Sequence, residues 1–395
     1  MTPAARIQTA IEILDRVLGG AAAEQALTQW ARASRFAGSG DRAAVRDHVF
    51  DALRRLRSYT ALGGGSRPSG RIVMLGALKA ASVNPETLFT GVGYGPMPLS
   101  AAETTAFADA PALHSLARSI ALDYPDWLEN DLNRSLGEAV LPVLQAMRHR
   151  APVILRVHAR RAERTAICAD LARDGIVARP VNLAGHALEI TENERKISQS
   201  SAYKAGLVEL QDASPQAAVE DLPLRRGMRV LDYCAGGGGK SLAVAALIDG
   251  DFFAHDIAPA RMRDLPERAR RAEANIKQIA TAMLETAAPF DLVLADVPCS
   301  GSGTWRRSPE AKWALTPERL VELQRIQAEI LDTAAGHVTA DGHLAYMTCS
   351  LLACENADQV RAFLHRNPDW SLVRERRYSP LEGGDGFYCA LLTRQ

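Results

Sequence analysis

The sequence predicts an α/β fold for the second half of the chain, with a parallel sheet that is covered by helices on both faces. From Arg226 onward, short continuous apolar runs alternate with segments of helical periodicity. This alternation is typical of parallel strands that are joined by helices. The chain also has 395 residues, which exceeds the size of one compact core and indicates two or three domains.

The region before residue 226 is predicted to be mainly helical. Apolar residues recur at helical spacing within 3–62, where Asp41 is a predicted N-cap. A glycine-rich stretch interrupts this pattern at 63–70, and helices are expected to resume over 72–148. From Ala151 a strand, a helix and a second strand follow one another, which indicates a small βαβ-type unit.

The strands of the predicted parallel sheet are the apolar runs beyond residue 226. They are "MRVLDYCA", "DFFAHDI", "IKQIATAM", "FDLVLADV", "GHLAYMTCS" and "FYCALLTR". A charged helix is expected over 259–275, a long helix over 317–338 and another over 355–366. Parallel sheets bind ligands beyond the carboxyl ends of their strands, so the residues that directly follow these runs are the candidate site residues.

The composition indicates a globular protein without a membrane-spanning segment. Apolar residues make up 47% of the chain and charged residues 23%, and no apolar run approaches the ~20 residues that cross a bilayer. Six scattered cysteines without a CxxC pair argue against a disulfide framework and against a zinc site. We therefore expect a cytoplasmic protein that holds no metal.

The net charge is zero, but the basic residues are unevenly distributed. Residues 1–72 hold eleven Arg against six acids, and residues 133–165 hold seven Arg against two acids. Arginine forks onto phosphates and stacks on bases, so one interpretation is a surface that binds nucleic acid. Ordinary solvated helix faces in a protein rich in arginine are the other interpretation, and charge alone does not decide between them.

The stretch "LDYCAGGGGKS" (231–241) is the clearest ligand-binding motif. It is no Walker phosphate loop, because Cys234 stands at the first glycine position, and no dinucleotide fingerprint, because Ser241 or Leu242 replaces its last glycine. It fits S-adenosylmethionine, whose methionine part a glycine turn admits and whose ribose hydroxyls bind an acid such as Asp256. A turn without a ligand is the alternative, and four consecutive glycines disfavour it on entropy.

Cys299 and Cys349 each follow an apolar strand, in the sequences "VPCSG" and "MTCSL". This placement suits chemistry on cytosine, where a thiolate that adds to carbon 6 makes carbon 5 reactive toward a methyl sulfonium. Asp296 is placed to stabilise the adduct at the pyrimidine N3, and a second cysteine can help to release the product. Two small buried hydrophobic residues are the alternative interpretation of the cysteine pair.

Residues 197–395 resemble the RsmB/Nop/Sun family of RNA cytosine-5 methyltransferases. The resemblance rests on "LDYCAGGGGKS", "DVPCSGSGTWRRSPEAKW", "YMTCSLLACEN" and "SPLEGGDGFYCALL", which occur in the family's order and spacing. It implies a class I methyltransferase fold, Rossmann-like with a mostly parallel seven-stranded sheet, and S-adenosylmethionine as the cofactor. It further implies Cys349 as the nucleophile, Cys299 as the cysteine that assists product release, and Asp296 as a contact to the base.

The resemblance also implies the remaining site residues. The cofactor-binding candidates lie around the glycine loop and are Cys234, Ala235, Gly236, Gly237, Gly238, Gly239, Lys240, Asp256, Arg261 and Asp296. The candidates for contact with RNA follow Cys299 and are Arg306, Arg307 and Lys312. We expect the arginine pair to meet phosphate, and we expect a monomer that acts on RNA without a membrane or a metal.

Upstream, "GDRAAVRDHVFDALRRLRSYTAL" resembles the NusB-like helical domain of bacterial ribosomal RNA methyltransferases of the RsmB type, and "RVHARRAERTAICADLARDGI" resembles the family's small RNA-binding subdomain. The expected domains are a NusB-like domain over 1–70, a helical extension over 71–148, an α+β RNA-binding subdomain over 149–225 and the methyltransferase domain over 226–395. Small-subunit ribosomal RNA is the expected substrate. Transfer RNA, or a non-catalytic role in RNA binding or ribosome assembly, are the alternatives.

Three positions depart from the family's pattern. Gly237 replaces the usual proline of the glycine loop, His158 replaces an asparagine, and Thr281 stands near the place of an aspartate that contacts the adenine side of the cofactor. The last departure predicts weaker cofactor binding and favours the non-catalytic alternative. The presence of both Cys299 and Cys349 favours an active enzyme.

Overall fold

The structure, a computed structural model, describes residues 1–395, and the chain divides into two compact units. The helical unit comprises Met1–Asn130, Glu138–Arg150 and Trp305–Ala314. The sheet unit comprises Asp131–Gly137, Ala151–Thr304 and Leu315–Gln395. A ten-residue segment from the C-terminal half of the chain, Trp305–Ala314, is therefore part of the helical unit.

The helical unit confirms the helices predicted over 3–62 and 72–148. Its longer helices are α1 (Pro3–Leu18), α2 (Ala23–Ala33), α3 (Ser39–Arg54), α4 (Leu56–Leu62), α5 (Gly70–Ala80), α6 (Ala101–Asp109) and α9 (Val140–Met147). Shorter ones are α7 (Arg118–Ala121) and α16 (Pro309–Ala314), and α8 (Glu129–Leu136) is divided between the two units. The apolar faces of α1, α2, α3 and α5 enclose one core, in which Leu14 and Val49 are fully buried.

The predicted N-cap of α3 is wrong. The helix begins at Ser39, its N-cap is Gly38, and Asp41 lies in the first turn. The Asp41 carboxylate accepts hydrogen bonds from the Gly38 backbone N–H at 3.2 Å and from the chain's terminal amine at 3.1 Å. An acid in the first turn satisfies the same free N–H groups as an N-cap, so the sequence pattern identified the residue but misplaced the helix start.

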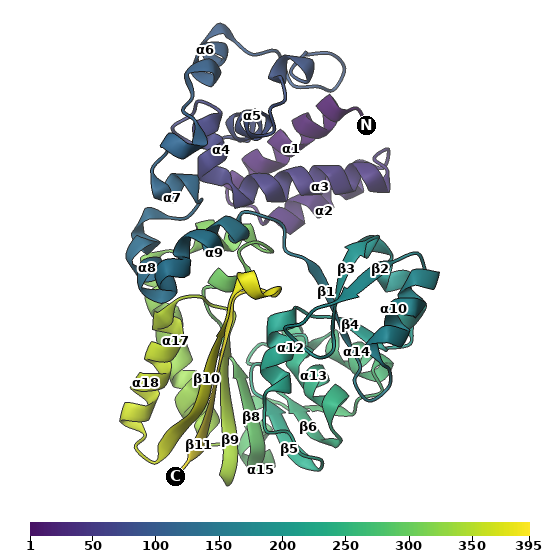
Figure 1. Ribbon diagram of the computed structural model, residues 1–395, viewed down its shortest axis with the longest axis vertical. Coiled ribbons are helices and arrows are strands. Elements are labelled where there is room, and N and C mark those ends of the chain that lie inside the picture. The colour runs from purple at the N-terminus through teal and green to yellow at the C-terminus, as the bar shows by residue number, and fades with distance from the viewer. The chain divides into compact units, whose positions relative to one another are not determined.

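A seven-stranded sheet forms the centre of the sheet unit, in the order β10-β11-β9-β8-β5-β6-β7 (Figure 1). The strands are β5 (Met228–Asp232), β6 (Gly250–Ala254), β7 (Ile276–Gln278), β8 (Phe290–Asp296), β9 (Val338–Thr348), β10 (Trp370–Tyr378) and β11 (Phe387–Arg394). The β6–β7, β5–β6, β5–β8 and β8–β9 pairs are parallel, whereas β9–β11 and β10–β11 are antiparallel. The prediction of a mostly parallel, seven-stranded, Rossmann-like sheet is confirmed.

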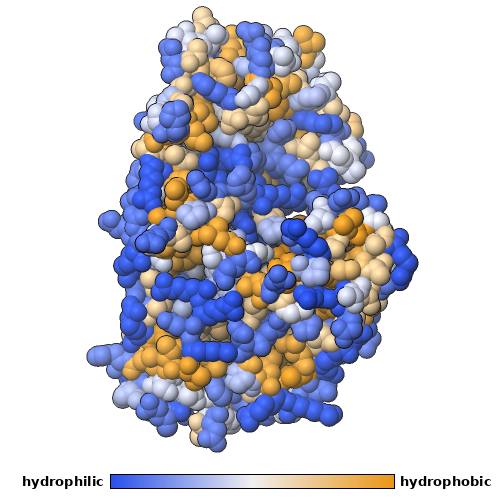
Figure 2. Space-filling model, in the orientation of Figure 1, coloured by the Kyte–Doolittle hydropathy of each residue, from blue (hydrophilic) through white to orange (hydrophobic).

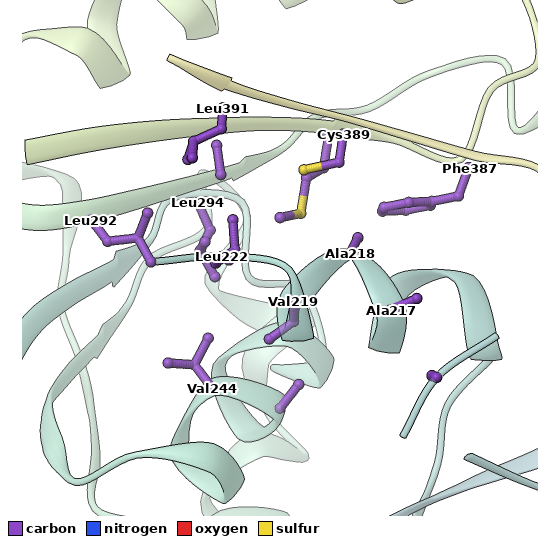
Figure 3. Close-up of a cluster of buried hydrophobic side chains, with 14 of the residues drawn as sticks. Ala217, Ala218, Val219, Leu222, Val244, Leu292, Leu294, Phe387, Cys389 and Leu391 are labelled. Carbon is purple, nitrogen blue, oxygen red and sulfur yellow. The ribbon is translucent and has the colours of Figure 1, made fainter. Parts of the chain in front are cut away.

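Both faces of the sheet are buried at β5, β8, β9 and β11, which explains why these strands read as continuous apolar runs. In β8, Leu292 and Leu294 face one core while Val293 and Ala295 face the other. Figure 3 shows the first core, where side chains of β8 and β11 meet those of α12 (Ala213–Glu220) and α13 (Gly239–Leu247). The second core packs against α17 (Pro317–Ala335) and α18 (Ala357–Arg366).

The charged helix expected over 259–275 is shorter than predicted. A 3-10 turn at Pro259–Met262 precedes α14, which spans only Leu265–Arg271. Pro266 lies in the first turn of α14, and proline disfavours a helical conformation at the residue before it. The short helix α15 (Leu284–Ala287) then leads into β8.

A second, smaller sheet belongs to the same unit and has the order β2-β3-β1-β4. Its strands are β1 (Val153–Val157), β2 (Val177–Pro180), β3 (Ala187–Glu192) and β4 (Val208–Leu210), with the helices α10 (Arg164–Arg173) and α11 (Ser201–Lys204). Every neighbouring pair is antiparallel, and β3 lies between β1 and β2. The predicted second strand, "HALEIT", is β3, which pairs antiparallel with β1. The prediction missed β2, the strand that completes a split βαβ unit with β1 and α10.

No helix of the chain is both long and apolar enough to span a membrane. On the face shown in Figure 2, hydrophilic residues cover most of the surface and apolar residues form separate patches.

Candidate active site

The predicted site residues of the sheet unit gather at one rim of the seven-stranded sheet. Because β5, β6, β8 and β9 are parallel neighbours, their carboxyl ends lie side by side. Asp256 follows β6, Asp296 ends β8 and Cys349 follows β9, and Asp232, which was not among the predicted site residues, ends β5. Three acids and a cysteine that are far apart in the sequence thus share one edge.

The glycine loop lies between β5 and α13, and its backbone requires glycine at two positions. Gly236 and Gly238 have φ angles of +50° and +76°, in the left-handed region. A Cβ on Gly238 would also lie 2.2 Å from Leu265 Cδ1, and a Cβ on Gly237 would lie 2.9 Å from Arg268 Nη1. Local geometry therefore requires glycine at Gly236 and Gly238, and the loop presents bare backbone at the rim.

Asp256 is anchored to this loop. Its side chain is almost fully buried, and one carboxylate oxygen accepts a hydrogen bond from the Gly236 N–H at 3.0 Å. The other oxygen accepts one from the Ala258 N–H at 2.9 Å, and Arg261 forms an ion pair at 3.2 Å. The neighbouring Ile257 is 80% exposed.

Asp232 lies beneath the loop and is fully buried. One of its oxygens accepts hydrogen bonds from the Ser241 N–H at 3.1 Å and the Ser241 hydroxyl at 2.7 Å, while Oδ1 has no partner. Burial raises the pKa of Asp232 to about 6, although the Ser241 bonds and the Lys240 ammonium oppose that shift. A buried carboxylate oxygen without a partner favours a cationic ligand or a ligand that donates hydrogen bonds at this rim.

Asp296 and Lys240 form an ion pair with an Nζ–Oδ2 distance of 2.5 Å. The Lys240 ammonium also lies over the Phe387 ring, 5.1 Å from its centroid. Burial lowers the pKa of Lys240, but the Asp296 carboxylate more than offsets this effect, with smaller contributions from Asp232 and the Cys349 sulfur, so the pKa lies above its ordinary value. Lys240 is therefore a cation at neutral pH.

The two cysteines form the other half of the rim. The Cys299 and Cys349 sulfurs lie 3.4 Å apart, and both are free thiols. The hydrogen bond with Cys349, together with burial and the nearby Glu355 carboxylate, raises the pKa of Cys299 well above its ordinary value. Cys299 thus keeps its proton at neutral pH.

Two family profiles match the chain. The profile described as 16S rRNA methyltransferase RsmB/F matches residues 220–392, and that of the RsmF/B-like ferredoxin-like domain matches residues 124–197. The ribosomal RNA small subunit methyltransferase B of Citrobacter koseri is 31% identical over 286 residues, which are 69% of this chain and 67% of that protein. The chain belongs to the RsmB/Nop/Sun family.

The enzyme of the same name from Vibrio cholerae is 33% identical, over 69% of this chain and 65% of its own length. The chain thus matches about two thirds of the length of these relatives. Among solved structures, PH0851 has a TM-score of 0.77 at 21% identity and covers 100% of this chain and 99% of its own. NSun6 from Pyrococcus horikoshii with SFG has a TM-score of 0.60 at 16% identity, covering 68% and 98%. At these identities the likeness shows a shared fold.

The cofactor of the RsmB/Nop/Sun family is S-adenosylmethionine, and the glycine-loop half of the rim fits it. The buried Asp256 carboxylate suits a pair of ribose hydroxyls, and the glycine loop leaves room for the methionine part. The unpartnered Asp232 oxygen suits the molecule's positive charge, and the exposed Ile257 suits the face of its adenine ring.

Sequence reasoning missed Arg156 and Gln211, which hold the glycine loop from outside. The buried Arg156, on β1 of the small sheet, donates a hydrogen bond to the Gly239 carbonyl at 2.9 Å, and Gln211 donates another at 3.2 Å. Arg268 also donates to the Gly237 carbonyl. The available signal was an arginine within the apolar strand "PVILRVHA", because a charge there requires a buried partner.

Thr281 and His158, two of the residues that depart from the family's pattern, lie in the sheet unit. Thr281 follows β7 and hydrogen-bonds to His255 at 2.9 Å, and the other ring nitrogen of His255 bonds to the Tyr233 carbonyl at 2.7 Å. Burial and neighbouring arginines lower the pKa of His158 to about 4, so this residue is a neutral imidazole at physiological pH. Neither replacement leaves a charge at the rim.

The RNA-contact candidates Arg306, Arg307 and Lys312 belong to the helical unit. Lys312 is 3% exposed, donates a hydrogen bond to the Arg54 carbonyl at 3.1 Å and lies over the Trp313 ring. Burial lowers its pKa to about 8. Arg306 is buried as well, and its backbone carbonyl accepts a hydrogen bond from Arg54 at 2.6 Å. Their predicted contact with RNA stays a prediction.

Proposed function

We propose that this protein transfers a methyl group to carbon 5 of a cytosine in RNA and that small-subunit ribosomal RNA is its substrate. The observation that carries the proposal is the pair of cysteine sulfurs, 3.4 Å apart, of which Cys299 holds its proton. A methyltransferase acting on a nucleophilic nitrogen or oxygen needs neither sulfur. The relatives named ribosomal RNA small subunit methyltransferase B support the choice of RNA.

S-adenosylmethionine, when bound by Asp256 and the glycine loop, supplies an electrophilic methyl group. The protein's own task is then to make carbon 5 of cytosine nucleophilic. Cys349 does this as a thiolate. When its sulfur bonds to carbon 6, the double bond between carbon 5 and carbon 6 is lost, the ring is no longer aromatic, and electron density moves to carbon 5. The target base must leave its stack to reach the sulfur, so loops or single strands of RNA are expected.

Asp296 and Lys240 act on the base from the same rim. As the sulfur adds to carbon 6, negative charge develops on the N3 side of the ring. A proton can pass from the Lys240 ammonium through the Asp296 carboxylate to N3, which neutralises this charge, and it returns by the same route when the ring is restored. The same pair keeps a cation close to the reacting sulfur.

Cys299 acts at the end of the reaction. Its bond with the Cys349 sulfur is the largest cause of its raised pKa, and this cause disappears once Cys349 is bonded to carbon 6. Cys299 can then pass its proton to water and, as a thiolate, accept the proton of carbon 5. Loss of that proton restores the ring double bond and expels Cys349 as a thiolate, which frees the methylated RNA.

The test is to express the Cys299→Ala variant in cells and to isolate protein that carries RNA through denaturation. The proposal predicts a stalled thioether between Cys349 and RNA, which the double variant with Cys349→Ala lacks. Sequencing of the attached RNA identifies the molecule and the nucleotide. Cys168→Ala is the matched control, because Cys168 packs in the core of the small sheet and its loss is expected to trap no RNA. An absence of adduct, with wild-type methyl transfer by Cys349→Ala, would contradict the proposal.

A further inference from the structure

One buried carboxylate binds the serine that follows each reactive cysteine. The Ser300 and Ser350 hydroxyls both lie 2.5 Å from Oε2 of Glu355, which is 0% exposed. The Ser300 backbone N–H donates to Oε1 of the same side chain at 2.8 Å. The repeated Cys-Ser pair of the sequence therefore has a single structural counterpart, and cytosine chemistry itself does not require it.

The Glu355 carboxylate fixes the direction of its own hydrogen bonds with the two serine hydroxyls. A carboxylate only accepts, so both serine hydroxyls must donate to it. Their oxygens are then free to accept, from the Ser302 N–H at 3.3 Å and from the Leu352 N–H at 3.0 Å. We call Glu355, Ser300 and Ser350 the serine clamp.

Further contacts attach the serine clamp to both cysteine loops. Gln327 donates to Oε1 of Glu355 and to the Pro298 carbonyl, both at 3.0 Å. Ser302 contacts the Ser350 hydroxyl at 3.0 Å and accepts from the Leu351 N–H at 2.8 Å. The loop after β8 and the loop after β9 are thus bonded through one charged group. A buried charge is tolerated where it accepts several hydrogen bonds, and its bonds are stronger than neutral ones.

We propose that Glu355 is a positioning residue that holds the Cys299 and Cys349 sulfurs in contact by binding the serine after each of them, and so sets the rate at which the methylated RNA is released. The effect on release rests on the proposed function, whereas the effect on the distance between the sulfurs does not. Release needs Cys299 at the adduct. Without the Glu355 carboxylate the two loops keep their direct bonds through Ser302 and from the Gly303 N–H to the Cys349 carbonyl, but the serines next to the cysteines lose the acceptor that they share.

The first experiment measures the effective concentration of the two thiols. Two protein thiols and one glutathione disulfide are brought to equilibrium with one protein disulfide and two glutathione thiols, and mass spectrometry quantifies the Cys299–Cys349 bond. We expect Glu355→Gln to lower the effective concentration at least about tenfold. The amide has one acceptor oxygen where the carboxylate has two, and its N–H groups would face the serine donors. Glu355→Asp, which keeps the charge, is expected to restore part of it.

The matched control is Glu220→Gln. Glu220 also accepts hydrogen bonds from backbone N–H groups, those of Gly185 and His186, at 2.7 and 3.1 Å. It is attached to the small sheet's loop and not to either cysteine loop. Its substitution is expected to leave the effective concentration within about twofold of wild type. A general destabilisation of the protein would lower the effective concentration of the thiols equally in Glu220→Gln and Glu355→Gln.

The second experiment follows the thioether to RNA in a single turnover. Glu355→Gln is expected to form the adduct and to resolve it about tenfold more slowly than wild type, so that adduct accumulates. Glu355→Gln equal to wild type in both experiments would overturn the proposal. If Glu355→Gln lowers the effective concentration of the thiols but no variant forms an adduct with RNA, the proposed cytosine chemistry is wrong and the positioning role of Glu355 stands. Should Glu355→Gln not fold, Ser300→Ala and Ser350→Ala decide, since each removes one donor, and wild-type values in both would overturn the proposal.

Discussion

The two halves of the sheet rim are built in opposite ways. The half at β5 and β6 is open. The Arg261 side chain is 61% exposed, Ile257 is exposed as well, and the loop consists of bare glycine backbone. The half at β8 and β9 is closed, with Ser300, Ser350 and Glu355 buried and bonded to one another behind the two sulfurs. The first half must admit and release a molecule, whereas the second must hold two atoms at a fixed separation.

The two halves also differ in how fully their polar groups are hydrogen-bonded. Polar groups in the open half keep unused hydrogen-bonding capacity, as the Asp232 oxygen without a partner illustrates. In the closed half each serine hydroxyl both donates and accepts. Unused capacity favours ligand binding, and fully used capacity favours a single geometry.

The largest expected effect lies in the closed half and concerns the Asp296–Lys240 pair. We expect Asp296→Asn to lower the rate of methyl transfer about 10²–10⁴-fold, because the base loses its proton donor. The affinity for S-adenosylmethionine is expected to change far less, which calorimetric titration checks. Asp291→Asn, at the other end of β8, is the control. Equal losses of rate and of cofactor affinity would show that Asp296 acts by binding the cofactor, like the residues of the open half.

Asp232, in the open half, predicts a pH dependence of stability. Its pKa is raised to about 6 from 3.8, so the folded protein binds more protons than the unfolded chain between these values. The free energy of unfolding should therefore fall as pH rises through this window and stay low above it, by up to about 3 kcal/mol. Asp232→Asn should remove the fall, measured by urea unfolding from about pH 4 to 8 without cofactor. An unchanged profile in that variant would refute the assignment.

Asp256 tests the open half by itself. We expect Asp256→Ala to weaken S-adenosylmethionine binding about 10–100-fold, which corresponds to the loss of one or two hydrogen bonds to a charged group. The separation of the sulfurs, measured as their effective concentration, should stay at the wild-type value. Asp251→Ala is the matched control, because Asp251 is an exposed acid on the same strand and pairs only with Lys277. Cofactor binding that is unchanged by Asp256→Ala would contradict the account.

The smallest effect concerns the glycine loop's backbone. Gly238→Ala should destabilise the protein by about 2–3 kcal/mol, because a left-handed residue gains a side chain that meets Leu265. Gly227→Ala is the control, since Gly227 has a similar φ of +84° but open space around it, and about 1 kcal/mol is expected. Thermal unfolding measures both, and equal losses would show that the close approach at Gly238 is of no consequence.

Much of the sheet rim could be predicted because its chemistry is local in sequence. An acid or a cysteine directly after an apolar strand lies at the rim of a parallel sheet, and this places Asp256, Asp296, Cys299 and Cys349 without knowledge of tertiary contacts. The charged strand β10 was missed, since most of its residues are exposed and do not form an apolar run. Its pairing with β11 depends on the terminal strand.

Contacts between distant segments could not be predicted in the same way. Glu355 looks like an ordinary helix-start acid in "ACENADQ", and only the fold brings it to Ser300. The inclusion of Trp305–Ala314 in the helical unit has a similar cause, because the Trp313 ring nitrogen donates to the Leu53 carbonyl at 2.7 Å. In both cases the decisive partner is far away in the sequence.

The central claim is that carbon 5 of cytosine receives the methyl group through attack by Cys349. The most direct test uses RNA whose cytosines carry tritium at carbon 5, together with S-adenosylmethionine labelled in its methyl group with carbon-14. The account predicts one tritium released to water for each methyl group incorporated, and neither event with Cys349→Ala. Methyl incorporation without tritium release would place the methyl group on another atom and contradict the account.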